Sequence, residues 1–441
     1  MRKIVREEGY ITVYAVTLLS LVFLLGSVAV GLAAQHRKIA LRALSLTQAY
    51  YIAEAGIEKV LADPGWLNTL PVDRDGTFEG DYYDSATYLS NQNYAGGSLT
   101  VKAVRKPPVN GHNLYRIYAT GRYGNTTRVL KVEAQVPLTS FDQGILAGGN
   151  VAISGFSSVN SNVQSGGHLN NTCTMINGNA SALGDITIEN MGRITGNASS
   201  GNNATVSLSS IEGDLKAARD VTTLGTIASY TNIGGGVRAG RNASINFSYV
   251  RGSVVAKNSV STSFSIVEGS SYIDPNLVVQ PPAIPGVADL SSYRSWFEEM
   301  ADQKYTGDRS FYTTDLQPLQ GLTFIDGKVN IRGEYSGQGT IVATGKITVN
   351  NDLKPRDSSR DLIILISLND DLEIKGNAQG LFYAGKNIVI NSLSDEVKGA
   401  LLAKQNITIT SSTFTFESSM LARQPAGSTG PVKITRWEEK Y

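Results

Sequence analysis

The chain has 441 residues with 39 basic and 38 acidic side chains, and this charge balance gives no electrostatic support for a nucleic-acid-binding role. Only 17% of the residues are charged, whereas glycine occurs 45 times among abundant Asn, Ser and Thr. That composition favours many short strands joined by tight turns over a disordered chain. The single cysteine, Cys173, excludes an internal disulfide but does not identify the compartment.

An uncharged apolar run extends from Tyr10 to Ala34. A helix needs about 20 residues to cross the bilayer core, whereas the apolar part of a cleaved signal peptide is about 7–15 residues long. The run is therefore predicted to be a membrane anchor over residues 10–34, in contact with lipid. Basic residues flank it on both sides, so the charges do not orient it.

The residues after the apolar run continue a helical pattern to Ala62. The stretch from Gln35 to Ala55 contains no Gly or Pro, and Pro64 disfavours a helical residue before it. Apolar residues recur at helical spacing, namely Leu41, Leu44, Ala49, Ile52, Ala53, Ile57, Val60 and Leu61. The pattern predicts one helix over residues 10–62, about 80 Å long, apolar all round in its first half and amphipathic in its second.

Two features of this region resemble PilX-type pilus-assembly proteins, which are minor type IV pilin-like proteins. A short basic leader, residues 1–9, ends in Gly9 immediately before the apolar helix, and the helix later contains Ala53-Glu54-Ala55-Gly56. The resemblance implies that a prepilin peptidase cleaves between Gly9 and Tyr10. It also implies that the helix anchors in the bacterial inner membrane, with the C-terminal part outside the cytoplasm, and then packs with other pilin subunits. Entry into a surface pilus is left open.

One position departs from the major pilins. They carry a glutamate at the fifth position after the cleavage site, where this chain has Tyr14. In that family the carboxylate is thought to pair with the amino terminus of a neighbouring subunit inside an apolar filament core, and a buried charge is tolerable only when it is paired. Tyr14 therefore indicates a minor subunit rather than one that builds the fibre.

Residues 63–140 are predicted to form a small antiparallel β head on the amphipathic half of the helix. After an irregular polar segment, 65–95, three alternating runs predict strands over Leu99–Val104, Leu114–Arg122 and Thr127–Val136. Five acidic residues in the polar segment lack the spacing of an EF-hand, so a solvated loop is favoured over a calcium site: Asp73, Asp75, Glu79, Asp81 and Asp84.

The rest of the chain repeats a Gly-x-x-x-Ala frame followed by a polar turn and a short alternating strand. The shared alanines are Ala147, Ala217, Ala239, Ala256, Ala343, Ala384 and Ala403, and the wide gap between Ala343 and Ala384 indicates a skipped rung. Such repeats predict a mainly-β, right-handed β-solenoid similar to the bactofilin-like β-helices, whereas a β-sandwich would show hairpins without this frame. Rungs are expected over 141–270 and 323–424, separated by a Pro-rich insertion with a short helix, 271–322, and followed by a polar tail or cap, 425–441.

No catalytic, cofactor-binding or metal-binding motif is present: His36, His112 and His168 do not have ligand spacing. The expected function is a non-catalytic, membrane-anchored, minor pilin-like subunit whose solenoid binds a surface, a glycan or a partner. One alternative is a bactofilin-like anchored scaffold that polymerises end to end, which predicts uncapped apolar rungs. The other is a glycan-active β-helix enzyme, which predicts that acidic residues converge in one groove, with Asp185, Glu189, Glu212, Asp214 and Asp220 as candidates.

Overall fold

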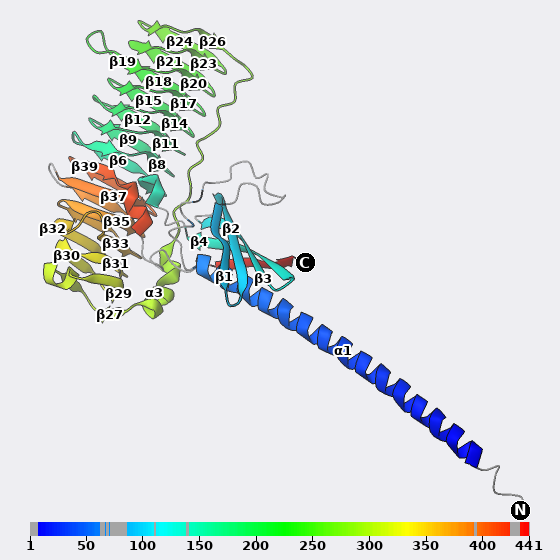
Figure 1. Ribbon diagram of the computed structural model, residues 1–441. Helices are drawn as coiled ribbons and strands as arrows, with labels where there is room; N and C mark the ends of the chain where they lie inside the picture. Colours follow the sequence, from blue (N-terminus) through cyan, green and yellow to red (C-terminus); the bar gives the residue numbers. More distant parts are fainter. Residues whose placement is uncertain are drawn as a thin grey trace, which may run out of the picture.

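The computed structural model describes residues 8–61, 67, 70, 86–109, 112–137, 141–391, 395–423 and 433–440. Within these ranges the chain forms a long helix, a small antiparallel sheet and a large parallel β-solenoid (Figure 1). The predicted fold class, a long helix with a three-stranded antiparallel sheet followed by a β-solenoid, is confirmed. The acidic segment from Asp73 to Asp84, for which a solvated loop was predicted, lies outside the described residues.

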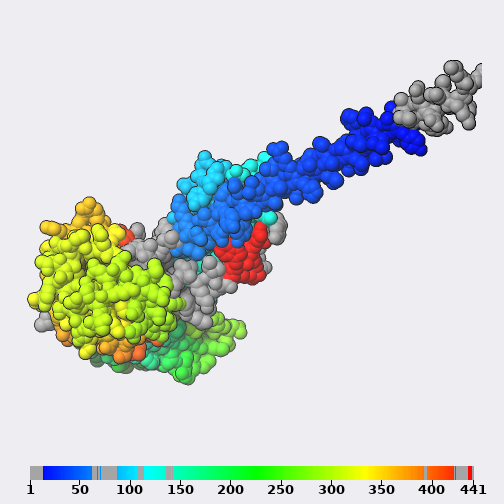
Figure 2. All heavy atoms as spheres, turned by 90° about the horizontal axis from the view of Figure 1, so that it is seen from below, coloured from blue at the N-terminus to red at the C-terminus, as the bar shows by residue number. Residues whose placement is uncertain are grey.

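Helix α1 spans Glu8–Leu61 and has two different halves. Every described side chain from Val13 to Leu44 is exposed, because this half extends away from the rest of the protein (Figures 1 and 2). Over its last turns one side of the helix is buried against the sheet, through Ala49, Ile52, Ala53, Ile57 and Val60. The helix is long and apolar enough to cross a membrane by length and composition.

The head is an antiparallel sheet with strand order β1-β2-β3-β4-β40. The three predicted strands correspond to the central ones, and the sheet has one further strand on each side. The bounds are β1 (Ala86–Tyr94), β2 (Gly97–Val109), β3 (His112–Tyr123), β4 (Thr126–Pro137) and β40 (Lys433–Lys440).

Two predictions about this region are wrong. The end of the supposed irregular segment is strand β1, whose pairing with β2 shifts register twice between Thr87 and Gln92. These irregularities, together with its polar composition, remove the clean alternation that identifies a strand. The C-terminal residues 433–440 do not cap the solenoid: they form β40, which pairs with β4 and places Trp437 opposite Val132.

The first block of the solenoid has a repeating three-strand turn, which gives three faces. Face A contains β5 (Ile145–Ala147), β8 (Val163–Ser165), β11 (Ala180–Ala182), β14 (Ala198–Ser200), β17 (Leu215–Ala217), β20 (Val237–Ala239), β23 (Val254–Ala256) and β26 (Ser271–Ile273). Face B contains β6 (Val151–Ser154), β9 (Leu169–Thr172), β12 (Ile186–Glu189), β15 (Ala204–Ser207), β18 (Val221–Leu224), β21 (Asn242–Asn246) and β24 (Ser259–Ser263). Face C contains β7 (Ser158–Asn160), β10 (Met175–Ile176), β13 (Arg193–Ile194), β16 (Ser210–Ile211), β19 (Thr231–Ile233), β22 (Ser248–Val250) and β25 (Ile266–Val267).

The second block continues the same parallel sheet with longer strands. Its strands are β27 (Gln303–Thr306), β28 (Arg309–Phe311), β29 (Leu319–Asp326), β30 (Val329–Tyr335), β31 (Gly337–Ala343), β32 (Ile347–Pro355), β33 (Leu362–Ser367), β34 (Leu372–Lys375), β35 (Ala378–Ala384), β36 (Ile388–Asn391), β37 (Glu396–Ala403), β38 (Ile407–Thr410) and β39 (Thr413–Phe416). Short helical turns accompany them, namely η1 (Phe141–Gln143), η2 (Leu290–Tyr293), α3 (Arg294–Met300), η3 (Thr313–Leu316) and η4 (Ser418–Arg423).

The two blocks stack in the reverse of their chain order. The last strands of the second block, β37, β38 and β39, pair with the first strands of the first block, β5, β6 and β7. The chain therefore enters and leaves the stack at its middle. Residues 274–302, which we call the strap, return from the upper end in Figure 1 to the lower end. The strap contains the predicted short helix as α3, and Phe297 of α3 is fully buried against the second block.

The repeated alanines form one buried column through both blocks. Ala217 pairs with Ala239, Ala239 with Ala256, and Ala384 with Ala403, which in turn pairs with Ala147 across the junction of the blocks. The skipped rung is confirmed. Ser367 fills it between Ala343 and Ala384, and its hydroxyl donates to the Gly345 carbonyl at 2.9 Å. Toward the two ends of the stack the same column holds larger residues, because Ile325 pairs with Ala343 and Ile273 pairs with Ala256. Within the column a buried serine fits when its hydroxyl has an acceptor.

Candidate functional site

The residues predicted for leader cleavage lie at the start of α1. Gly9 and Tyr10 are in its first turn, and Tyr14 follows on the exposed half, where its side chain points away from the head and solenoid. Tyr14 is thus available to a membrane or to another helix. This half of α1 is a surface for an apolar environment, because its long row of exposed Leu, Val and Phe side chains would be unfavourable in water.

The predicted motif Ala53-Glu54-Ala55-Gly56 is the contact between α1 and the sheet. Ala53 is fully buried and Gly56 is buried, while Glu54 and Ala55 lie half-buried beside the contact. A Cβ atom at Gly56 would lie 2.6 Å from Cδ1 of Leu99 and 2.8 Å from a Val101 methyl carbon. The small residues of the motif therefore let the helix approach β2 closely.

The sheet contributes a matching small residue that the sequence reasoning missed. A Cβ atom at Gly121 in β3 would lie 2.1 Å from the Ala49 carbonyl oxygen and 2.6 Å from the Ala53 nitrogen. Here the helix backbone itself touches the strand, so any side chain would separate the two elements. The signal was available as Ala119-Thr120-Gly121, a glycine interrupting an alternating strand, which often marks close approach of another backbone.

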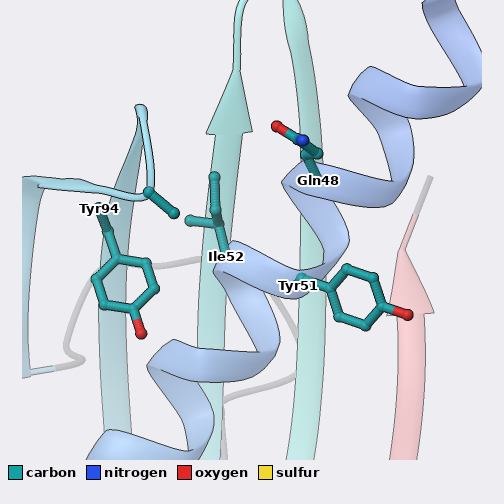
Figure 3. Close-up of a pocket in the computed structure, with 5 residues that line it drawn as sticks. Gln48, Tyr51, Ile52 and Tyr94 are labelled. Atoms are coloured by element: carbon teal, nitrogen blue, oxygen red, sulfur yellow. The ribbon is translucent and has the colours of Figure 1, made fainter.

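A shallow groove of about 250 Å³ lies where the helix meets the β1–β2 turn (Figure 3). It is lined by Gln48, Tyr51, Ile52, Tyr94 and Ala95. The two tyrosine rings lie on opposite sides of Ile52, which points toward the sheet. This lining has no carboxylate or imidazole, so the groove offers aromatic and amide contacts rather than acid–base chemistry.

Strands β3, β4 and β40 of the head are joined by ion pairs. The Arg116 guanidinium on β3 lies 2.8 Å from the Glu133 carboxylate on β4, and the Lys131 ammonium lies 3.0 Å from the carboxylate of Glu438 on β40. Burial by itself raises the pKa of Glu133, but the hydrogen bond from Arg116 and the charge of Lys106 outweigh it and lower that pKa. These pairs hold the strands in register.

The five candidate carboxylates of the solenoid are spread over several columns. Oδ1 of Asp185 accepts from the backbone nitrogen of Asn203 at 3.0 Å, and Oδ1 of Asp214 accepts from that of Gly236 at 2.9 Å. Asp220 accepts from the backbone of Asn242, and the hydrogen bond from Arg241 lowers its pKa. Glu212 pairs with Arg193, while Glu189 lies on face B. These carboxylates are therefore engaged mainly in joining one rung to the next.

One of these columns is a ladder of amide, carboxylate and imidazole side chains, in which every member except the last, Asn242, accepts a backbone N–H from the next rung; Asn242 accepts from the Ser259 hydroxyl. It runs through Asp371, Asn387, Asn406, Asn150, His168, Asp185, Asn203, Asp220 and Asn242. His168 has the same role as the asparagines, because its Nδ1 accepts from the Asp185 nitrogen at 3.0 Å. The described residues contain no group of three or more His, Cys, Asp or Glu side chains that could hold a metal ion.

Comparisons with known proteins add two distant likenesses. No protein-family model matches the chain, and no curated protein sequence matches it. Among solved structures, the chain is similar to the competence-associated pilin ComZ from Thermus thermophilus, with 12% identity, a TM-score of 0.33, and coverage of 90% of this chain and 97% of that one. It is also similar to an ice binding protein from an Antarctic bacterium of the Flavobacteriaceae, with 12% identity, a TM-score of 0.13, and coverage of 63% and 97%.

Proposed function

We propose that this chain is a membrane-anchored, non-catalytic, minor pilin-like subunit that presents its solenoid for adhesion or partner binding. In this proposal a prepilin peptidase removes residues 1–9, and the helix anchors the protein in the bacterial inner membrane with the head and solenoid outside the cytoplasm. Other pilin subunits then contact the exposed half of the helix.

The observation that carries the proposal is the division of α1. Its half from Val13 to Leu44 is exposed on all sides, and its other half packs into the head through Ala53 and Gly56. Burying each exposed Leu, Val or Phe would stabilise the protein by about 1.5–3 kcal/mol, so an apolar partner for this half is strongly favoured. A bilayer and a bundle of similar helices both provide one.

Tyr14 supports a minor rather than a major subunit. A glutamate at this position would need a charged partner inside an apolar bundle, and Tyr14 removes both that requirement and the corresponding attraction. A subunit without this pair has one contact fewer with its neighbour and is expected to join assemblies built mainly by other chains.

The test is the mass of the mature protein. The full chain is expressed in bacterial cells with and without a prepilin peptidase, and the intact mass is measured together with the N-terminal sequence. We expect a mature start at Tyr10 only when the peptidase is present. Gly9→Val should block this cleavage, whereas the matched control Gly26→Val, in the same helix, should be cleaved normally. A mature start at Met1 in the presence of an active peptidase would exclude the pilin-like assignment.

A second candidate function is an anchored scaffold that associates through the upper end of its solenoid. The last rung there is not capped: Ile266 is 56% exposed and Ile273 is 51% exposed, at the open edge of β24, β25 and β26. The lower end differs, because the Arg309 guanidinium covers the Tyr305 ring at 4.2 Å. The scaffold function therefore predicts that two copies of the chain associate through the upper ends of their solenoids. Sedimentation of the full chain in detergent tests it, and Ile273→Lys should abolish any dimer that forms this way.

A further inference from the structure

The three faces of the first solenoid block differ in what covers them. On face A the outward-pointing Leu146 and Val255 are buried, and Leu146 belongs to the apolar cluster that contains strap residues Leu290 and Phe297. Face C carries polar pairs between rungs, including Arg193 with Glu212. The outward side chains of face B are uncovered. We call these face B side chains the platform.

The platform is nearly free of charge. Its members alternate with buried residues along every strand except β24, which lies at the open end of the stack. They are Ala152, Ser154, Asn170, Thr172, Thr187, Glu189, Thr205, Ser207, Thr222, Leu224, Ser244, Asn246, Ser261 and Ser263. Glu189 is the single ionisable residue in this set. The repeated parallel pairing arranges the hydroxyl and amide groups in rows along the stack, one rung about 4.8 Å from the next.

An apolar ridge borders the platform at the corner that follows face B. The ridge consists of Phe156, Cys173, Met191, Leu208, Phe247 and Phe264. Their exposed fractions reach 79% for Phe156, 70% for Met191 and 76% for Phe264, and the rings of Phe247 and Phe264 stack with centroids 4.9 Å apart. From Phe156 to Phe264 the ridge covers six rung spacings, or about 29 Å.

Each ridge residue has a left-handed backbone conformation, with φ between 45° and 68°. Glycine and asparagine adopt this conformation most readily, whereas bulky residues rarely do. The corner is stabilised by the next residue instead. The hydroxyl of Ser209 donates to the Ser207 carbonyl at 2.7 Å, and Ser157, Ser248 and Ser265 make equivalent bonds to carbonyls before the corner. The fold itself therefore does not require an apolar side chain at these corners.

Apolar side chains stand at six of the seven corners from β6 to β24, with Gly225 at the corner after β18, and those of Phe156, Met191 and Phe264 are largely exposed. Bulky apolar residues in a strained, solvent-facing position indicate a surface for contact with something outside the protein. The partner must match a straight apolar ridge beside rows of uncharged hydroxyl and amide groups. A charged partner would find almost no complementary charge on the platform. A sugar chain matches both parts, because its rings have apolar C–H faces and hydroxyl edges, and a stack of rungs offers the same contacts repeatedly along one direction.

We propose that the platform and ridge bind a neutral, extended polysaccharide, with the sugar rings resting on the ridge and the hydroxyl groups bonded to the platform. This inference rests on the adhesive role proposed for the solenoid, but it does not depend on leader cleavage or on the membrane anchor. A failure of the pilin-like assignment can therefore be distinguished from a failure of the polysaccharide site, because intact mass measures leader cleavage and the following experiment measures only sugar binding.

The test is affinity electrophoresis of the full chain in detergent micelles. Native gels contain hydroxyethyl cellulose, laminarin or dextran as neutral probes, and polygalacturonate as the anionic probe. We expect at least one neutral probe to retard the protein, with little dependence on salt because no charge pairing is involved. Polygalacturonate should have no effect.

The ridge variant is Phe156→Asn combined with Phe264→Asn, because asparagine suits the left-handed corner and preserves the fold. Its affinity should fall about tenfold or more, as expected for loss of the two most exposed aromatic contacts of the ridge. The control is Tyr272→Asn, an aromatic position on face A that is 50% exposed. For the platform, Thr205→Lys should weaken binding, whereas Ser181→Lys on face A should not. Circular dichroism verifies that each variant is folded.

Three results would overturn the proposal. In the first, no neutral probe retards the wild-type protein, or only polygalacturonate does. In the second, the ridge variant and the Tyr272→Asn control bind equally well. In the third, sedimentation shows that the ridge variant converts a dimer into a monomer, in which case this surface is an interface between two copies of the chain.

Discussion

The contact at Gly56 gives a quantitative test of how the helix meets the head. In Gly56→Ala the added methyl carbon would lie 2.6 Å from Cδ1 of Leu99, whereas two carbon atoms prefer a separation of about 3.5–4.0 Å. Either α1 moves away from β2 or Leu99 changes its side-chain conformation. Such overpacking costs about 1–3 kcal/mol.

A second effect opposes this cost. Gly56 lies inside a helix, where alanine is favoured over glycine by about 1 kcal/mol. The net loss expected for Gly56→Ala is therefore about 0–2 kcal/mol by these two estimates. Gly56→Val should cost more, because its two further methyl groups enter the same space and a β-branched residue gains less helix propensity.

Hydrogen exchange of the amides of β2 and β3 measures the local opening free energy of the head without requiring the whole chain to unfold in one step. A loss of 1.4 kcal/mol corresponds to about tenfold faster exchange. Gly31→Ala is the matched control, since it is the same change in the same helix with nothing within 4 Å. In a protein that also carries Leu99→Ala, the clash should be absent. Gly56→Val and Leu99→Ala should therefore show a favourable coupling free energy of about 0.5–3 kcal/mol.

Two outcomes would refute this account of Gly56. One is exchange in Gly56→Val as slow as in the wild-type protein. The other is an additive response to Gly56→Val and Leu99→Ala, because additivity would mean that the two residues do not compete for space.

Two further predictions concern the strap. The Tyr383 hydroxyl donates to the Ala288 carbonyl at 2.7 Å and accepts from the Leu290 nitrogen at 3.1 Å. Tyr383→Phe leaves these two buried backbone groups unpaired, so it should lower the opening free energy of the strap by about 2–4 kcal/mol. Hydrogen exchange of the Leu290 amide measures this change. Burial by itself raises the pKa of the Asp289 carboxyl, but hydrogen bonds from Lys404 and Ser291 outweigh burial and hold that pKa below its ordinary value of 3.8. The Asp289 carboxylate therefore stabilises the folded strap fully above pH 3.8, and this stabilisation is lost as the pH falls through the lowered pKa of the folded state. Limited proteolysis should cut the strap faster at pH 2.5 than at pH 5. Asp289→Asn should abolish that difference.

The parts of the fold that follow from local pattern were predictable. Strands β2, β3 and β4 alternate cleanly, and the alanine column repeats at the rung spacing, so periodicity identifies both. Strand β40 was not predictable in the same way. Nothing in residues 433–440 specifies that they pair with β4, almost 300 positions earlier, because strand pairing depends on where the intervening chain returns.

The order of the solenoid rungs also could not be predicted from the sequence. From Ala343 to Ala256 each rung carries a small residue at this position, so by local pattern Ala256 is as suitable a neighbour for another rung as Ala403. The placement of the strap decides the order, and the strap is held by Tyr383 and by the buried Phe297 rather than by any repeat. Tertiary packing thus selects among pairings that the local sequence leaves equivalent.

The ridge was missed because the usual rule for a left-handed corner points to glycine or asparagine. The signal in this chain is instead an apolar residue followed by serine or threonine, seen in Phe156-Ser157, Cys173-Thr174, Phe247-Ser248 and Phe264-Ser265. The hydroxyl in each pair provides the turn, which leaves the preceding position free to carry any side chain. A search for this pair at the rung spacing would have located these corners, but not the one at Met191, which Gly192 follows.

The position of the head relative to the stack links these features. Strand β4 leads into the solenoid at β5, and β39 leads out toward β40, while β37, β38 and β39 pair with β5, β6 and β7 at the middle of the stack. Because β40 then pairs with β4, the solenoid is an insertion in the head sheet. Strand β40 can therefore dock on β4 only after the second block has brought the chain back to the middle of the stack. The same arrangement leaves the upper end of the stack and face B away from both connections to the head. Face B, with its platform and ridge, is therefore one of the surfaces that neither the strap nor the head occupies, and it is the one whose uncharged rows and apolar border fit a neutral partner.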